Sequence, residues 1–312
     1  MLIKNDAAIR HQAKTTEHDH WAGAIAMLGF VFVAAAQVTN MILARGVAGT
    51  VPPFTLAFFR WAIVAAGLAP LAVAEIRSGR LSLRADGLLI LATGFFGMFL
   101  CGGPVYLAGN TTTAINIALI MSLSPIVVML VSCMFGLERI GALQVLGMGL
   151  ALIGALLIVS QGNLQKLIEL RFAKGDQIMF VAMLGWSGYT LLQSRVAGSA
   201  SFLARVSAFA TAGAMFSFPA AVMEMWSAPH SAFASRALGA YLFAALVPGL
   251  LAYAGFAYLG SRFGSVRASI TMYLGPAASA LLSWAILGEA PTLIHVFGGT
   301  LILSGVWASL RK

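Results

Sequence analysis

Charged residues are scarce in this sequence. Only 9% of its 312 residues are Asp, Glu, Lys or Arg, while 60% are hydrophobic. Soluble globular domains carry about 25% charged residues, so the composition excludes a soluble globular protein. The mean hydropathy of +0.91 and the long apolar runs instead predict helices that cross a lipid bilayer.

Residues that carry chemistry are also few. Cys101 and Cys133 lie inside apolar runs, which indicates small buried hydrophobic residues rather than a disulfide or metal framework. The histidines and acidic residues lie in polar gaps or at the ends of apolar runs, so no nucleophile with a base and no metal constellation is expected within the bilayer. The sequence also has no P-loop. These absences predict a protein that is not an enzyme, does not use ATP and needs no cofactor or metal.

Ten apolar runs can be drawn along the chain, each near the ~20 residues that cross a bilayer. They cover residues 21–44, 53–76, 87–108, 113–136, 143–160, 177–196, 202–225, 238–259, 265–288 and 293–309. The longest internal polar gap lies after the fifth run. We therefore expect a cytoplasmic tail at residues 1–20, a first repeat at 21–160 (helices 1–5), a linker at 161–176 and a second repeat at 177–310 (helices 6–10).

The basic residues indicate how the runs are oriented. The net charge is +9, but lysine and arginine lie almost entirely in the polar gaps, which favours membrane topology over nucleic-acid binding. If the N-terminus is cytoplasmic, 13 of the 19 basic residues fall on the cytoplasmic side, so both termini are predicted to be cytoplasmic. Arg60 lies within a run, and we interpret it and Arg205 as helix-end anchors that reach the membrane surface, with substrate binding as the alternative.

The two halves carry the same residues at a separation of 151 positions. The pairs are Met121/Met272, Pro125/Pro276, Glu138/Glu289, Gly147/Gly298 and Gly154/Gly305. Five helices per half is an odd number, so the second half must enter the membrane from the opposite side. The predicted fold is an all-α polytopic membrane protein with ten transmembrane helices in two inverted five-helix repeats and a ligand site between them. The glycines, seven residues apart in each half, permit close helix packing.

Several stretches resemble the EamA family of the drug/metabolite transporter superfamily. Residues 53–61 (PFTLAFFRW) are similar to its second-helix signature, and residues 123–154 and 274–305 resemble its fourth and fifth helices in each repeat. The resemblance covers residues 21–310 and implies a central cavity and alternating access for small metabolites, mostly by export. Within the family the chain most resembles bacterial aromatic amino-acid exporters, which implies a bacterial inner (plasma) membrane.

Substrate recognition at membrane depth needs polar or aromatic side chains that face a cavity. The candidate substrate-binding residues are Gln37, Asn40, Tyr106, Asn116, Trp186, Tyr189, Gln193, Tyr253 and Tyr273. Trp186, Tyr189 and Gln193 share one helix face. Rings and amides together suit a zwitterion with a flat apolar side chain, although the same residues also serve as interhelical packing. Pro125 and Pro276 are candidate gating hinges, with a static bend as the alternative.

The function expected from these observations is alternating-access export of small metabolites, with aromatic and other neutral amino acids as the leading class. Because no acidic residue lies mid-helix, facilitated movement is expected rather than proton coupling. A multidrug or organic-cation exporter is the alternative, and a channel or an intramembrane enzyme is less expected. The expected partners are a small-molecule substrate and the lipid bilayer, without nucleic acid, in a monomer or weak homo-oligomer.

Overall fold

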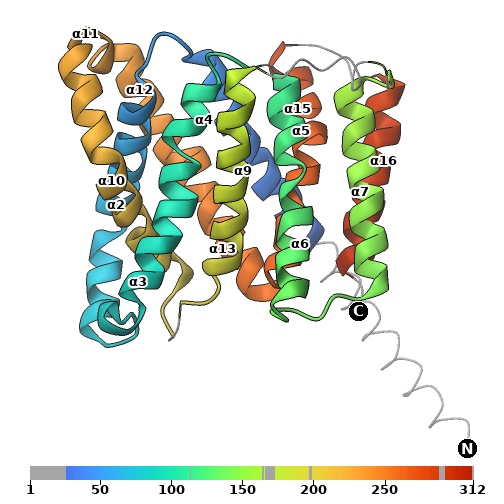
Figure 1. The fold of residues 1–312 in the computed structure, drawn as a ribbon, viewed down its shortest axis with the longest axis horizontal. Coiled ribbons are helices and arrows are strands. Elements are labelled where there is room, and N and C mark those ends of the chain that lie inside the picture. Colours follow the sequence, from blue (N-terminus) through green and yellow to red (C-terminus); the bar gives the residue numbers. More distant parts are fainter. Residues whose placement is uncertain are drawn as a thin grey trace, which may run out of the picture.

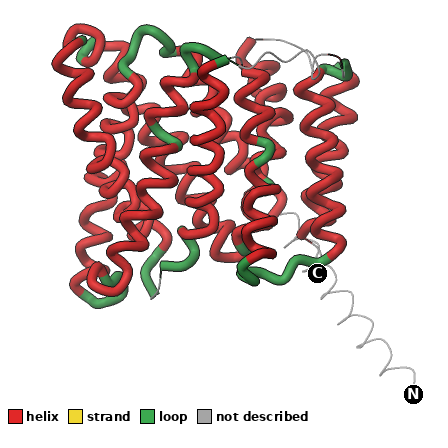
Figure 2. Tube along the Cα trace, viewed as in Figure 1, coloured by secondary structure: helices red, strands yellow, loops and turns green. Residues whose placement is uncertain are grey.

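The computed structural model describes residues 26–112, 114–163, 165, 173–196, 199–287 and 292–310. Within these ranges the chain is helical and has no strand (Figures 1 and 2). The helices stand side by side in one bundle, and most connecting loops lie at its two ends (Figure 2). The predicted N-terminal tail, part of the predicted linker and Glu289 lie outside the described residues.

The first described helix covers Ala26–Gly46. The elements that follow are α2 (Pro53–Arg77), α3 (Leu83–Gly94), η1 (Phe95–Leu100), α4 (Gly103–Ala108), α5 (Ala114–Met121), α6 (Ser124–Met134), α7 (Ala142–Ser160), α9 (Lys174–Leu192), α10 (Phe202–Ser227), α11 (Pro229–Ala232), α12 (Ser235–Ala244), η2 (Ala245–Leu251), α13 (Ala252–Phe263), α14 (Ser265–Ser269), α15 (Thr271–Leu287) and α16 (Leu293–Leu310).

Seven helices in the described part of the chain are long and apolar enough to cross a membrane. They are Ala26–Gly46, Pro53–Arg77, Leu83–Ala108, Ala142–Ser160, Phe202–Ser227, Ser235–Phe263 and Leu293–Leu310. A shorter apolar segment, Leu119–Met134, runs from the end of α5 through α6. Large apolar side chains such as Leu88 and Trp226 are 84% and 88% exposed, as expected where the surroundings are lipid rather than water. The described residues therefore form an all-helical, multi-pass membrane protein.

Proline interrupts the two halves differently. Residues 113–136 were predicted as one run, but α5 and α6 are separated by a turn at Ser122 and Leu123. Pro125 lies in the first turn of α6, where the missing N–H of proline costs little. Its repeat partner Pro276 lies inside α15. The two predicted hinges thus occupy different positions in their helices.

Two of the long helices contain a π segment, and the segments η1 and η2 begin at Phe95 and Ala245. A π turn breaks the regular i→i−4 hydrogen-bond ladder. In η1 the carbonyl of Met98 accepts a hydrogen bond from Trp61 Nε1 at 2.8 Å, and the carbonyl of Gly97 accepts one from the Tyr253 hydroxyl at 2.7 Å. Aromatic side chains of α2 and α13 therefore stabilise the irregular backbone of η1.

Two helix pairs form opposite sides of the bundle. α2 packs along α10, and α7 packs along α16 (Figure 1). The glycines of α7 and α16 allow a close approach, as their spacing predicts. A Cβ atom added to Gly154 would lie 2.6 Å from the carbonyl oxygen of Gly298 and 2.9 Å from the backbone nitrogen of Ile302. The backbones of these two helices therefore meet without intervening side chains.

Candidate functional site

Arg60 lies at the centre of a buried polar cluster. Its side chain belongs to α2 and is only 1% exposed. Nη1 donates to Asn40 Oδ1 at 2.9 Å and to the Tyr106 hydroxyl at 3.0 Å, and Nη2 donates to the carbonyl of Pro248 at 2.7 Å. The Tyr106 hydroxyl in turn donates to Asn40 Oδ1 at 2.8 Å. Residues from both halves of the chain thus surround one guanidinium group.

Two aromatic rings complete the surroundings of Arg60. Its Cζ atom lies 4.3 Å from the ring centroid of Trp61 and 5.5 Å from that of Tyr253. Ring faces attract a guanidinium electrostatically. Our interpretation of Arg60 as a membrane-surface anchor is wrong, because the side chain points into the bundle, where three neutral acceptors and two rings hold it.

The Arg60 cluster borders a small cavity of about 40 Å³, which we call the central cavity. Its lining includes Gln37, Asn40, Arg60, Cys101, Trp186 and Tyr253. Three of these residues have buried polar atoms without a hydrogen-bond partner among the described residues, namely Gln37 Oε1 and Nε2, Arg60 Nε and Trp186 Nε1. Buried polar atoms are normally paired, so these lining residues have unused hydrogen-bonding capacity.

A larger pocket of about 370 Å³, the apolar pocket, adjoins the central cavity. The two share the side chains of Gln37, Met41, Met121 and Met272. The apolar pocket lies between helix Ala26–Gly46, α5 and α15, and Pro276 belongs to its lining. Methionine side chains adapt to different apolar shapes and contact aromatic rings favourably. The two spaces together therefore offer a polar end and an adaptable apolar end.

Aromatic residues close the other side of the central cavity. The ring of Trp186 lies 5.4 Å from Tyr253 and 4.8 Å from Phe256, and the rings of Tyr189 and Tyr253 are 5.1 Å apart. All four side chains are buried. We call this set the aromatic partition. The Tyr189 ring also packs directly on the backbone of Gly97 in η1, where a Cβ atom would collide with it.

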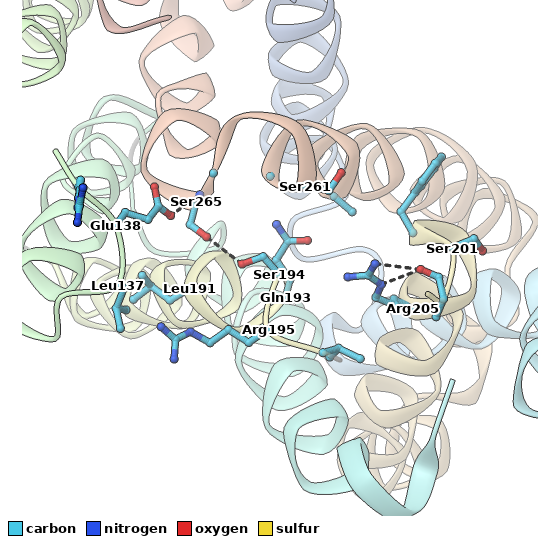
Figure 3. Close-up of a pocket in the computed structure, with 17 residues that line it drawn as sticks. Leu137, Glu138, Leu191, Gln193, Ser194, Arg195, Ser201, Arg205, Ser261 and Ser265 are labelled. Atoms are coloured by element: carbon cyan, nitrogen blue, oxygen red, sulfur yellow. Dashed lines mark hydrogen bonds between the residues drawn. The ribbon is translucent and has the colours of Figure 1, made fainter. Parts of the chain in front are cut away.

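Gln193 lies on the far side of the aromatic partition, one helical turn beyond Tyr189 on α9. It lines a third space of about 960 Å³, the end pocket, together with Glu138, Arg139, Arg195 and Arg205 (Figure 3). The end pocket is polar and lies where the loops after α6, α9 and α13 meet. Three arginines make it electropositive.

The structure separates the remaining predicted residues from the central cavity. Asn116 Nδ2 donates to Asp176 Oδ2 at 2.9 Å, and the other oxygen of Asp176 accepts from the Thr112 hydroxyl. Because the backbone nitrogen of Ala173 also donates to Asp176, at 2.6 Å, this group caps the start of α9. Tyr273 is fully buried and lines none of the three spaces.

The structure brings Gln37, Asn40, Trp186 and Tyr253 to the lining of the central cavity, and Tyr106 to its edge through Arg60. Sequence reasoning favoured a helix-end anchor for Arg60 and left it out of the candidate substrate-binding residues. The signal was present, because Arg60 is a basic residue within an apolar run, and an ionisable residue inside the membrane is a functional candidate by default. Among the described residues, no group of His, Cys, Asp and Glu is arranged to hold a metal ion.

Comparisons with known proteins agree with this architecture. The model of the EamA-like transporter family matches residues 21–160 and 173–311. The chain is 24% identical over 282 residues to an uncharacterized transporter of Bacillus subtilis, YyaM, with 90% of this chain and 91% of that protein covered. It is 25% identical over 255 residues to a probable terminal-alkyne amino-acid exporter of Streptantibioticus cattleyicolor, with 80% and 79% covered.

A solved crystal structure shares the fold, with a TM-score of 0.67 at 20% identity over 91% of this chain and 96% of that chain. The matched family residues comprise nearly the whole sequence. The family and these relatives are transporters, which in general are not enzymes. The chain belongs to the EamA-like transporter family.

Proposed function

We propose that this protein exports small metabolites across a bacterial inner membrane by facilitated, alternating access, and that aromatic and other neutral amino acids are its substrate class. The observation that carries the proposal is the central cavity with its adjoining apolar pocket. Gln37, Arg60 and Trp186, which have buried polar atoms without a partner among the described residues, line the central cavity. Methionines line the apolar pocket. The Streptantibioticus cattleyicolor relative, a probable terminal-alkyne amino-acid exporter, supports an amino-acid substrate.

Alternating access requires two halves that exchange shapes, and we propose ten transmembrane helices in two inverted repeats with both termini cytoplasmic. Contacts between α7 and α16 support this arrangement. A Cβ atom on Gly147 would lie 2.5 Å from the carbonyl oxygen of Gly305, and one on Gly154 would lie 2.6 Å from that of Gly298. Since Gly147 corresponds to Gly298 and Gly154 to Gly305, a two-fold rotation exchanges these two contacts.

The central cavity also takes its lining from both halves, with Gln37 and Arg60 from the first and Trp186 and Tyr253 from the second. A site at the interface of two inverted repeats can open to either side as one half moves against the other. We propose that the aromatic partition closes the path to the end pocket in this conformation. The end pocket then corresponds to the cytoplasmic entrance, where the positive-inside rule places Arg139, Arg195 and Arg205.

The second candidate, export of organic cations, is disfavoured by Arg60. A fixed positive charge in a medium of low dielectric repels a cationic ligand strongly. The lining of the central cavity includes no acidic residue, so it offers no negative charge to a cation and no carboxylate that could exchange a proton with it. Facilitated movement along the substrate's own gradient is therefore the simplest mechanism.

Efflux from proteoliposomes tests the proposal. Vesicles loaded with labelled phenylalanine, tryptophan or threonine are expected to release at least one of them saturably without an imposed proton gradient. Trp186→Ala and Gln37→Ala remove cavity groups and should abolish this release. Trp226→Ala is the matched control, because Trp226 is 88% exposed at the end of α10. Well-folded protein that releases no amino acid, with or without a gradient, contradicts the proposal.

A further inference from the structure

We infer that Arg60 is an anion-binding residue, and that the substrate of the central cavity must carry a carboxylate group. The inference rests on the proposed transport function and deepens it, because it states which chemical group the site recognises. It starts from an imbalance of charge. Arginine guanidinium groups stay protonated in proteins, and the partners of Arg60 among the described residues are an amide, a phenol and a backbone carbonyl, all of them neutral.

A buried cation without a counter-charge is costly, and proteins usually compensate it with an anion. The rings of Trp61 and Tyr253 lower this cost but bring no negative charge. An anionic ligand would supply the missing charge at the moment of binding. The same argument explains why Arg60 is held so firmly by Asn40 and the carbonyl of Pro248, because a fixed guanidinium binds an anion without reorganising.

The free hydrogen-bonding atoms have the composition that a carboxylate requires. Arg60 Nε, Gln37 Nε2 and Trp186 Nε1 are N–H donors on residues that line one cavity, and none has an acceptor among the described residues. An ionised carboxylate is an acceptor with about four lone-pair sites, and hydrogen bonds to it are charge-assisted. Gln37 Oε1 is the one free acceptor in the set, and it suits the ammonium group of an amino acid.

The sizes of the central cavity and the apolar pocket indicate which end of the ligand each of them binds. The central cavity measures about 40 Å³, a few times the ~10–15 Å³ that is needed to hold one water, so it accepts only a small head group. The apolar pocket of about 370 Å³ has room for an aromatic or branched aliphatic side chain. The structure therefore selects a small molecule with a carboxylate at one end and an apolar body at the other. Bound water is the competing occupant of the central cavity.

Four ligands that share one phenyl ring but differ in their charged groups test whether binding requires a carboxylate. They are L-phenylalanine, 3-phenylpropionate (carboxylate without ammonium), 2-phenylethylamine (ammonium without carboxylate) and L-phenylalaninamide. Binding is measured in detergent by thermal stabilisation and tryptophan fluorescence, and transport is measured by efflux from vesicles. We expect wild-type protein to bind phenylalanine and 3-phenylpropionate and to ignore the two ligands that lack a carboxylate.

Substitutions at Arg60 complete the test. Arg60→Gln removes the charge and should weaken binding of both carboxylates about 30-fold or more. Arg60→Lys keeps a charge but loses the planar donor fork, so an intermediate loss is expected. Arg262→Gln is the control, because Arg262 lies exposed at the end of α13 and should bind as wild type. If Arg60→Gln does not fold, the ligand pattern of the wild-type protein and the Arg60→Lys variant still decide the question.

The inference is overturned if 2-phenylethylamine and phenylalaninamide bind as tightly as phenylalanine, or if folded Arg60→Gln binds 3-phenylpropionate with wild-type affinity. Either result would mean that Arg60 does not bind the carboxylate of the ligand. A different result would contradict the proposed function but not the anion site. If no amino acid is released from vesicles but 3-phenylpropionate still binds in an Arg60-dependent manner, the anion site stands and the amino-acid substrate class does not.

Discussion

Glu224, near the end of α10, accepts hydrogen bonds from the backbone nitrogen and the hydroxyl of Thr55, at 2.7 Å and 3.0 Å, in the first turn of α2. Pro52, at the N-cap of α2, offers no side-chain cap of its own. At the opposite end of the same pair, Glu75 of α2 accepts from the backbone nitrogen of Ser201, the N-cap of α10, at 2.8 Å. Each helix of the pair therefore caps the other.

Replacing Glu224 by alanine should destabilise the protein by about 1–3 kcal/mol, because a buried helix start would lose its acceptor. Glu224→Gln keeps an acceptor oxygen and should cost less. Thermal or denaturant unfolding in detergent measures both. Thr55→Val combined with Glu224→Ala forms a double-mutant cycle, and strictly additive losses in that cycle would argue that the hydroxyl and the carboxylate are not coupled.

The glycines of α7 provide a second test. Gly147 faces the backbone of α16, whereas a Cβ atom on Gly149, two residues away, would meet nothing within 4 Å. Gly147→Val should therefore force α7 and α16 apart and lower the unfolding temperature sharply or prevent folding. Gly149→Val makes the same change in helix propensity and should leave the unfolding temperature nearly unchanged. Equal effects of the two substitutions would mean that helix propensity rather than the α7–α16 contact decides stability.

The hydrogen bond from Tyr253 to the π segment η1 provides a third test. Tyr253→Phe keeps the ring beside Arg60 but leaves the carbonyl of Gly97 without its donor, which should cost about 1–3 kcal/mol. The unfolding temperature in detergent should fall accordingly. Tyr258→Phe is the control on the same helix, because Tyr258 is half exposed. An unchanged unfolding temperature for Tyr253→Phe would show that η1 does not depend on this hydrogen bond.

Cys101 offers a chemical probe of the central cavity. It is buried and belongs to the cavity lining, whereas Cys133 on α6 is exposed. In a Cys133→Ala background, a small neutral thiosulfonate should modify Cys101 slowly, because the reagent must enter through the cavity. A transported substrate should slow the reaction further, and Trp186→Ala should accelerate it. A rate that substrate leaves unchanged would argue against occupancy of the central cavity.

The sequence predicted more of the architecture than of the site. Composition and run length were enough for a multi-pass helical protein, and the seven-residue glycine spacing predicted that α7 and α16 can pack closely against a neighbour. That the two helices pack against each other came from the structure. The inward orientation of the Arg60 side chain could not be predicted from its place in the apolar run. Counting residues from a helix end does not tell which face of the helix meets the interior of the bundle. Arg60 is seven residues from the start of α2, yet its side chain turns toward η2 and Asn40.

The predicted helix face of Trp186, Tyr189 and Gln193 illustrates the same limit. Spacing puts the three side chains on one side of α9, but it does not tell that the residues lie at different depths along it. Trp186 therefore reaches the central cavity, whereas Gln193, ~10 Å further along the axis, reaches the end pocket. Asn116 was predicted from polarity alone, and it meets Asp176 because both lie at helix ends that fold together.

The fixed charge of Arg60 has a consequence for how membrane voltage acts on transport. A zwitterion carries no net charge across the bilayer, so the membrane potential neither drives nor opposes its export. A simple carboxylate such as 3-phenylpropionate carries one negative charge, and a potential of 100 mV, negative inside, favours its exit by about 2.3 kcal/mol. If Arg60 binds the carboxylate as we propose, its charge stays with the protein and favours binding of both ligands, while the voltage acts only on the second.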